Sequence, residues 1–233
     1  MIVLGFDTSA GACSAAVLGA DGAIRAHCRR ILERGHAEAL MPMLQEVLAA
    51  AAVDFAMLGL LAVTTGPGTF TGIRIGLAAA RGLALASGLP LLGVTSFDAV
   101  AAAVSAEARA GRTLLVAIDS RRDDLFVQSF NPQNEPLGPA LAVVAQDLAA
   151  VAPAGDIVIA GDAAARAAGL LKAAGRDAVV ARDPGPPDAV QVVQLARRRW
   201  QPDQPQPLPR PTYLRAPDVT LPAPTGSPAR PAR

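Results

Sequence analysis

The stretch Leu60–Ala86, LLAVTTGPGTFTGIRIGLAAARGLALA, constrains the fold more than any other part of the chain. It begins within the short apolar run Leu58–Val63, which is typical of a strand covered on both faces. The turn Gly66–Gly68 ends this strand, and Thr69 or Thr71 is placed to cap a helix. The sequence therefore predicts a buried strand, a tight glycine turn and a long helix in direct succession.

One side of the predicted helix carries almost no side-chain bulk, because Gly72, Gly76, Ala80 and Ala84 recur at four-residue spacing. A glycine inside a helix costs roughly 0.5–1 kcal/mol relative to alanine, so we expect another helix to pack closely there. A glycine turn before a helix can also bind phosphate through free backbone N–H groups. This turn lacks the lysine of a P-loop and the spacing of a dinucleotide fingerprint, which favours a tight turn over a ligand site.

Composition indicates a globular chain without a charged surface for polyanions. Of the 233 residues, 52% are hydrophobic, but only six Phe, one Tyr and one Trp are aromatic, so Ala, Leu and Val must form most of the core. The net charge of +1 argues against a dedicated polyanion-binding surface. Cys13 and Cys28 are expected to be free thiols. Asp7 interrupts the apolar start, and Gly66–Gly68 interrupts the longest uncharged stretch, so we expect a cytoplasmic protein with no membrane segment.

Residues 1–110 predict a first lobe with the order βββαβαβα. The first three strands form a meander, and the alternation along residues 23–30 gives it a wet outer face. The helix after residue 35 has one apolar face, and a single helix is expected over residues 96–109. The predicted strands are Ile2–Asp7, Ala12–Leu18, Ala23–Arg30, Leu58–Val63 and Leu91–Val94, and the predicted helices are His36–Ala52, the helix after Gly68, and Ser96–Arg109.

Residues 111–200 predict a second lobe that is a reduced copy of the first. Thr113–Asp119 is an apolar strand that ends in aspartate, as Ile2–Asp7 does. Two lobes built on one plan is an inference from element order, because the letters repeat weakly. The remaining predicted elements are Leu125–Phe130, Ala140–Val144, Gln146–Val151, Ile157–Ala160, Ala163–Ala174, Ala178–Ala181 and the final helix Asp188–Trp200.

Residues 201–233 form a proline-rich C-terminal tail that cannot be helical. Within it, the segment 212–220 holds the only tyrosine of the chain, Tyr213, beside a leucine. We expect this segment to pack back on the body and the residues after Pro222 to be loose.

The meander with Asp-Thr-Ser at its first turn resembles the duplicated α/β fold of actin, sugar kinases and heat-shock chaperones, which is of the ribonuclease H-like type. More narrowly, the chain is similar to the TsaB (YeaZ) family. The resemblance covers most of the chain in the right order and rests on the segments IVLGFDTSAGACSAAVL, GHAEALMPML, TTGPGTFTGIRIGLAAARGLA, GVTSFDAVA and YLRAPDVT.

The resemblance implies a role in making N6-threonylcarbamoyladenosine, at the adenosine beside the anticodon of tRNAs that read codons beginning with adenine. In this family the transfer chemistry belongs to the catalytic subunit TsaD, and TsaB supports it together with the ATPase TsaE. The implied partners are therefore TsaD in a heterodimer and TsaE, with tRNA reached through the complex and a homodimer formed when the chain is alone.

The sequence offers no metal site. By the same resemblance, the segment of TsaD-like proteins that matches Gly93–Ala101 carries two histidines four residues apart, suited to holding a metal. The corresponding positions here are Ser96 and Val100, and valine cannot bind a metal. His27 and His36 lie elsewhere in the chain, so we expect neither a metal site nor a catalytic residue.

The sequence leaves open whether the chain binds a nucleotide. Fold relatives bind ATP between the lobes, and Asp7, Thr8 and Ser9 keep the first half of such a clamp. The second half, residues 120–124, has no glycine, and its acids would repel phosphate. We expect no cofactor of its own; a vestigial nucleotide loop at Asp7–Ser9, a mere turn-capping role for Asp7, and ATP at the interface of the complex all stay open. Gly161-Asp162, after the strand Ile157–Ala160, is only thin evidence for a remnant of an adenosine-binding turn.

Without chemistry, the function must be binding. Two helices presenting methionine and glycine make an adaptable surface for the equivalent helices of a partner, and Met41 and Met43 are expected to lie partly exposed. The expected partner interface consists of His36, Leu40, Met41, Met43, Leu44, Gly72, Ile73, Gly76 and Ala80. The alternatives are an ATP-binding kinase or ATPase of this fold and a metallopeptidase-like protein. The run Arg197–Arg199 before Trp200 is either an RNA contact or an exposed helix end.

Overall fold

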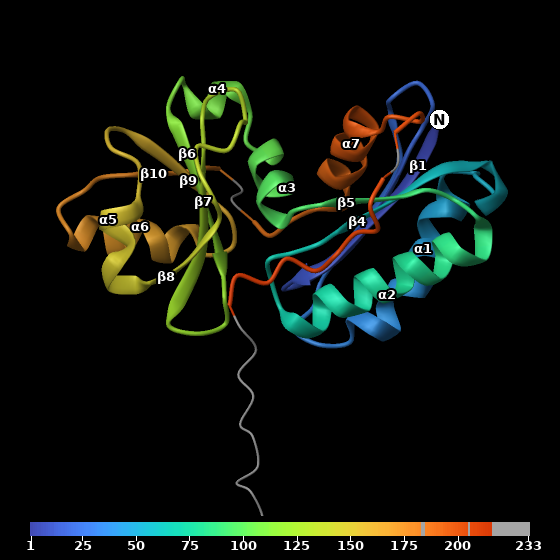
Figure 1. The fold of residues 1–233 in the computed structure, drawn as a ribbon, viewed down its shortest axis with the longest axis horizontal. Helices are drawn as coiled ribbons and strands as arrows, with labels where there is room; N and C mark the ends of the chain where they lie inside the picture. The colour runs from blue at the N-terminus through green and yellow to red at the C-terminus, as the bar shows by residue number, and fades with distance from the viewer. Residues whose placement is uncertain (183–184, 205, 216–233) are drawn as a thin grey trace, which may run out of the picture.

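The computed structural model describes residues 1–182, 185–204 and 206–215, and within them the chain forms two lobes, each built on a five-stranded sheet (Figure 1). The first sheet has the order β3-β2-β1-β4-β5, in which β1, β2 and β3 pair antiparallel while β4 and β5 run parallel to β1. Its strands are β1 (Ile2–Ala10), β2 (Ala12–Leu18), β3 (Ile24–Ile31), β4 (Leu58–Thr64) and β5 (Leu91–Val94).

The second sheet repeats this plan in the order β10-β9-β6-β7-β8, with β6 in the place of β1 and the same parallel and antiparallel pairings. Its strands are β6 (Thr113–Asp119), β7 (Asp124–Phe130), β8 (Leu141–Val144), β9 (Ile157–Ala160) and β10 (Val179–Val180). The predicted α/β fold of two lobes, the second a reduced copy of the first, is confirmed.

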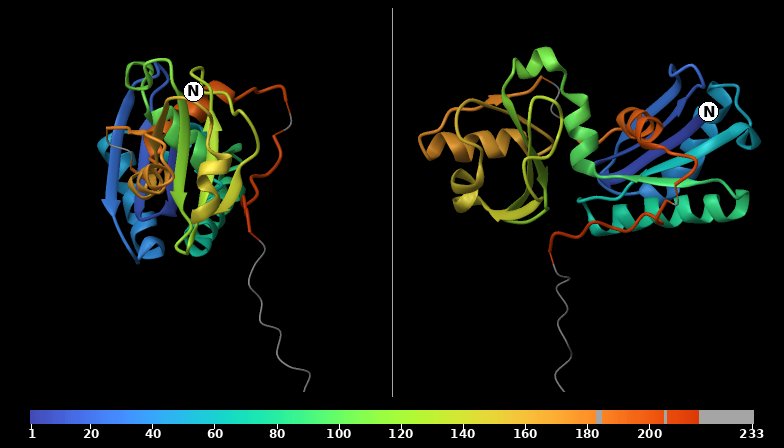
Figure 2. Two further views of the ribbon diagram at one scale, coloured as in Figure 1. Left: turned by 90° about the vertical axis from the view of Figure 1, so that its left-hand side faces the viewer. Right: turned by 45° about the horizontal axis from the view of Figure 1, so that its top comes forward.

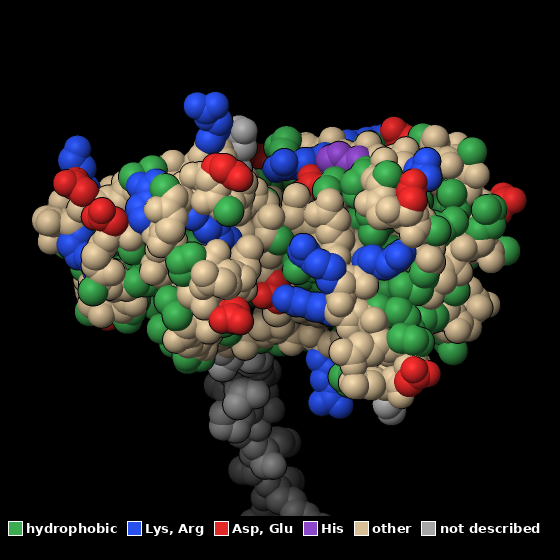
Figure 3. All heavy atoms as spheres, turned by 90° about the horizontal axis from the view of Figure 1, so that it is seen from above, with side chains coloured by type: hydrophobic (Ala, Val, Ile, Leu, Met, Phe, Trp, Pro, Cys, Tyr) green, Lys and Arg blue, Asp and Glu red, His purple; other side chains and the backbone are tan. Residues whose placement is uncertain are grey.

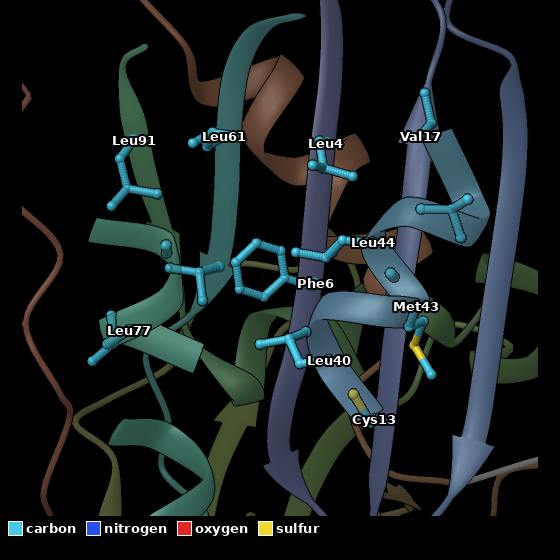
Figure 4. Close-up of a cluster of buried hydrophobic side chains, with 14 of the residues drawn as sticks. Leu4, Phe6, Cys13, Val17, Leu40, Met43, Leu44, Leu61, Leu77 and Leu91 are labelled. Atoms are coloured by element: carbon cyan, nitrogen blue, oxygen red, sulfur yellow. The ribbon is translucent and has the colours of Figure 1, made fainter. Parts of the chain in front are cut away.

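The helices α1 (His36–Ala50) and α2 (Phe70–Ser87) cover one face of the first sheet. Figure 4 shows Leu40, Met43 and Leu44 of α1 among Leu4, Phe6 and other strand residues of this core. In the second lobe, α5 (Leu148–Val151) and α6 (Ala164–Ala173) cover the corresponding face of the second sheet. Short 3-10 helices lie at Phe55–Met57 and Ala145–Asp147.

Two helices lie between the sheets (Figures 1 and 2). The helix α3 (Ser96–Ala103) buries Phe97 and Val100 against strands of the second sheet. The helix α7 (Ala189–Arg199) buries Val192 and Val193 against the first sheet, where Gly5 allows close approach. The helix α7 thus covers the second face of the first sheet. The predicted second lobe, residues 111–200, therefore ends with a helix that packs on the first lobe.

The helix predicted over Ser96–Arg109 is two helices, α3 and α4 (Ala106–Arg109). The first ends at Val104, whose backbone is extended, and the Ser105 side chain then accepts a hydrogen bond from Ala108 N to cap a new turn. The sequence contained this signal, because serine is a preferred N-cap residue.

The described part of the tail returns along α2 and reaches the second lobe (Figure 2). Thr212 N donates to Thr65 O at 2.7 Å, Arg81 donates to Pro209 O at 2.5 Å, and Arg215 forms an ion pair with Asp124 of β7. Residues 206–215 thus touch both lobes. The rest of the predicted segment 212–220, from residue 216 onward, and the residues after Pro222 lie outside the described residues.

The glycine side of α2 packs against β1 and not against another helix, which corrects the expectation from the sequence. A Cβ atom at Gly72 would lie 2.0 Å from Thr8 O, and one at Gly76 would lie 2.6 Å from Thr8 Oγ1. Thr8 Oγ1 donates to Gly72 O at 2.7 Å. The small residues therefore let the helix sit directly on the end of the first strand.

This geometry predicts opposite effects for two glycines of the same helix. Gly72→Ala places a methyl group against a backbone carbonyl, so it should lower the free energy of unfolding by about 1–3 kcal/mol. Gly82→Ala meets nothing within 4 Å and should raise it by about 0.5–1 kcal/mol, because alanine favours the helix. Urea denaturation of both variants checks this, and equal effects at the two positions would refute the close packing on β1.

Candidate functional site

The residues Asp7, Thr8 and Ser9 lie at the end of β1 where the lobes meet, and all three are buried. Asp7 Oδ1 accepts hydrogen bonds from Ser9 N at 3.1 Å, from Ser9 Oγ at 2.6 Å and from the Thr64 hydroxyl. Ser9 Oγ is also 3.1 Å from Ser96 Oγ at the start of α3. The sequence thus places three strand and helix ends, from β1, β4 and α3, around one buried polar network.

The turn Gly66–Gly68 packs directly on this network and covers it. Thr69 N donates to Ser9 O at 2.7 Å, and a Cβ atom at Gly68 would lie 2.1 Å from the same carbonyl oxygen. Thr69 then caps α2 by accepting from Gly72 N at 3.2 Å. Asp7, Thr8 and Ser9, predicted as a vestigial nucleotide loop, are thus buried beneath this turn and bond to neighbouring residues.

The second predicted half of a nucleotide clamp also has local partners. In the turn between β6 and β7, Ser120 Oγ donates to Asp124 Oδ1 at 2.5 Å, and Asp124 is paired with Arg215. Gly161 has a positive φ of 107° beneath Ala117 O, and Asp162 Oδ1 accepts from Asp119 N at 2.8 Å. These groups fasten β6 to its neighbours.

At the two positions compared with metal-binding histidines, Ser96 and Val100 are both buried. His36 is buried beside β1, with Nε2 3.0 Å from Ala10 O, and His27 Nε2 lies 3.0 Å from Asp188 Oδ1. Among the described residues, no three His, Cys, Asp or Glu side chains gather in a metal-binding arrangement. None of the described helices is both long and apolar enough to span a membrane.

The predicted partner interface divides into core and surface. Leu40, Met43, Leu44, Ile73 and Ala80 are buried in the first lobe, and Gly72 and Gly76 are buried against β1. The expectation that Met43 is partly exposed was wrong, because α1 buries a face wide enough to include both Met43 and Leu44. Met41 is 43% exposed, as predicted.

The exposed side of α1 and α2 contains residues that sequence reasoning missed. Leu85 is 88% exposed, and Ala78, Gly82 and Ala86 share the outer side of α2 with it. Pro42 and Ala49 flank Met41 on α1. We call these seven residues the outer helical face. The four-residue spacing of Ala78, Gly82 and Ala86 could have identified it, since it repeats the signal of the buried stripe two positions away, on the opposite side of the helix.

The arginine run before Trp200 is largely engaged in structural contacts. Arg197 donates to Met1 O at 2.7 Å and to Ala20 O at 3.2 Å, and Arg199 pairs with Asp98 at 2.9 Å. On the face drawn in Figure 3, basic and acidic side chains are interspersed over both lobes. These observations favour the helix-end interpretation of the run.

Burial makes the Asp7 carboxyl group a weaker acid than usual. Removal from water raises its pKa from 3.8 to about 6, against the opposing effect of the hydrogen bonds from Ser9 and Thr64. Its second oxygen, Oδ2, has no hydrogen-bond partner within the described residues. The carboxyl group therefore keeps its proton to a higher pH in the folded chain than in the unfolded chain.

Stability should consequently fall as pH rises through this range. The unfolded chain releases the Asp7 proton near pH 4 and the folded chain near pH 6, so about 3 kcal/mol of unfolding free energy is lost between pH 4 and pH 7. Asp7→Asn should remove that loss, which urea denaturation at several pH values would show.

Asp21→Asn is the control. The pKa of the exposed Asp21 is lowered, chiefly by its hydrogen bond from Ala23 N, so its contribution to the free energy of unfolding increases as pH rises. Parallel pH profiles of wild type and Asp7→Asn would contradict the assignment.

Comparison with known proteins gives a consistent result. A family model described as TsaD, tRNA N6-adenosine threonylcarbamoyltransferase, matches residues 30–166. The chain is 37% identical over 126 residues to the tRNA threonylcarbamoyladenosine biosynthesis protein TsaB of Escherichia coli, which covers 54% of this chain and 53% of that protein. It thus spans about half the length of such TsaB relatives.

Two further relatives extend over most of the chain. An uncharacterized protein of Mycobacterium bovis is 33% identical over 227 residues, covering 93% of both chains. The structure of YeaZ from Pseudomonas aeruginosa superposes with a TM-score of 0.78 at 26% identity, covering 91% of this chain and 99% of that one. Sequence and fold agree over nearly the whole length, and the chain belongs to the TsaB/YeaZ family.

Proposed function

We propose that the chain is a non-catalytic subunit required to form N6-threonylcarbamoyladenosine, at the adenosine beside the anticodon of tRNAs that read codons beginning with adenine. Membership of the TsaB/YeaZ family and the similarity to the E. coli threonylcarbamoyladenosine biosynthesis protein support the pathway. The closed turn over Asp7–Ser9 supports a binding role, because the polar groups at the lobe junction mostly bond to one another.

The observation that carries the proposal is the outer helical face. A pair of neighbouring helices that exposes Leu85 and Met41 between alanine and glycine positions permits a partner helix to approach closely. Methionine adapts its shape to the surface opposite. We propose that the catalytic subunit TsaD binds here through its own equivalent helices, forming a four-helix contact.

The partner interface proposed from the sequence changes accordingly. Met41 remains a contact residue, and the buried members, such as Leu40 and Gly76, act by holding α1 and α2 in place on the sheet. In the absence of TsaD, the same face of a second copy can substitute, which gives a homodimer. The subunit needs no cofactor of its own, and TsaE and ATP act in the assembled complex.

A charge on the outer helical face should break the complex without unfolding the chain. Met41→Glu and Leu85→Glu should each weaken binding of the cognate TsaD at least about tenfold, because an unpaired carboxylate would be buried at the contact. Titration calorimetry measures the affinity, and tRNA modification by the chain, TsaD and TsaE measures the function. Leu141→Glu, at an exposed position of the second lobe, is the matched control.

Two outcomes separate the parts of the proposal. Wild-type affinity in both variants would place the interface elsewhere while leaving the function intact. Full modification of tRNA by TsaD and TsaE without this chain would overturn the function itself.

A further inference from the structure

A groove follows the lobe junction past the N-terminal end of α2. A cavity of about 390 Å³ lies between the Pro67–Phe70 segment, residues 120–122 and the returning tail at 212–215. A second cavity of about 690 Å³ adjoins it toward the start of α1. Thr69 and Arg121 line both cavities, so the two adjoin at these residues, and we call them together the groove.

Exposed aromatic rings mark one end of this groove. Phe70 is 48% exposed and Tyr213 is 42% exposed, whereas the other aromatic side chains of the chain are buried or partly buried. Their ring centroids are 5.5 Å apart at an interplanar angle of 29°, so the rings stack. A chain with so few aromatic residues thus presents two of them together at the surface.

Arginines surround the stacked pair. The Arg74 guanidinium carbon lies 3.6 Å from the centroid of the Phe70 ring, and Arg74 Nε donates to the Tyr213 hydroxyl at 3.1 Å. Arg121 extends across the junction and is half-exposed, with Asp119 as a distant ion-pair partner at 3.7 Å. Arg121, Arg122 and Arg215 line the aromatic end of the groove, whereas Glu33 and Glu38 line the far end, next to Arg34.

The aromatic platform is held firmly from both lobes. Thr212, which precedes Tyr213, donates to Thr65 O, and Arg215 pairs with Asp124 of the second lobe. Leu214 packs against the hydrophobic cluster between α3 and the second sheet, which includes Phe126. A ligand that stacks on Tyr213 would therefore meet a surface that is already ordered.

We propose that this groove binds a single-stranded segment of RNA, with an unpaired base stacked at the Phe70–Tyr213 pair and a phosphate at Arg121. Aromatic faces and arginines in one groove are the chemistry by which proteins hold single strands. Two adjoining cavities leave room for a strand that runs from one to the other. The inference rests on the proposed function, which supplies an RNA whose target adenosine lies in a loop.

The test uses the full chain and a fluorescently labelled ten-nucleotide single-stranded RNA, with binding followed by anisotropy from low to moderate salt. Tyr213→Leu should weaken binding about tenfold through loss of stacking, and Tyr213→Phe should restore most of it because the ring remains. Arg121→Gln should reduce the magnitude of the slope of log K against log salt by about 0.7. Arg25→Gln, near the start of β3 and outside the groove, should leave that slope unchanged.

Each alternative has its own result. Absence of saturable binding by the wild-type chain, or unchanged affinity and slope in Tyr213→Leu and Arg121→Gln, would overturn the groove. If AMP displaces the labelled strand at a lower concentration than the unlabelled decamer does, the groove is a site for a free nucleotide and not for a strand. If these variants still bind TsaD and support tRNA modification fully, the groove is refuted while the proposed function stands.

Discussion

The contact between the glycine side of α2 and the end of β1 determines how the rest of the molecule is arranged. Thr8 O and Ser9 O lie where side chains at Gly72 and Gly68 would otherwise project. This close approach brings the Gly66–Gly68 turn down on Asp7–Ser9 and buries the polar end of the strand. It also directs the N-terminal end of α2, with Phe70 and Arg74, toward the second lobe.

The surfaces left by this arrangement are the basis of both functional proposals. Because the inner side of α2 is used on the sheet, its outer side, with Ala78, Gly82 and Leu85, is what a partner can contact. The end of the same helix supplies the aromatic part of the groove. One helix therefore contributes to three contacts: the core, the proposed TsaD interface and the proposed RNA groove.

Local patterns predicted the elements and their order well. The strand, turn and helix at Leu60–Ala86 and the repeated plan of the two lobes follow from short-range periodicity and are confirmed by the sheet order. The contacts between elements that are distant in the sequence could not be predicted from these local patterns. The partner of the Gly72 stripe, the return of α7 to the first sheet, and the burial of Met43 depend on which surfaces meet in space. Arg109 is another such case: it is buried and donates to Ala101 O and Asn131 O, which no spacing rule indicates for an arginine at a helix end.

The packing of α7 has a consequence for synthesis of the chain. Val3, Leu18 and Leu60 lie on a face of the first sheet that packs against α7, which comes near the C-terminal end of the predicted second lobe. Domains of many proteins fold as they emerge from the ribosome, amino-terminal part first. Here the first lobe reaches its final core only after Val192 and Val193 have been translated. A ribosome stalled within the second lobe would therefore hold a nascent chain with an uncovered apolar sheet, which is a substrate for chaperones.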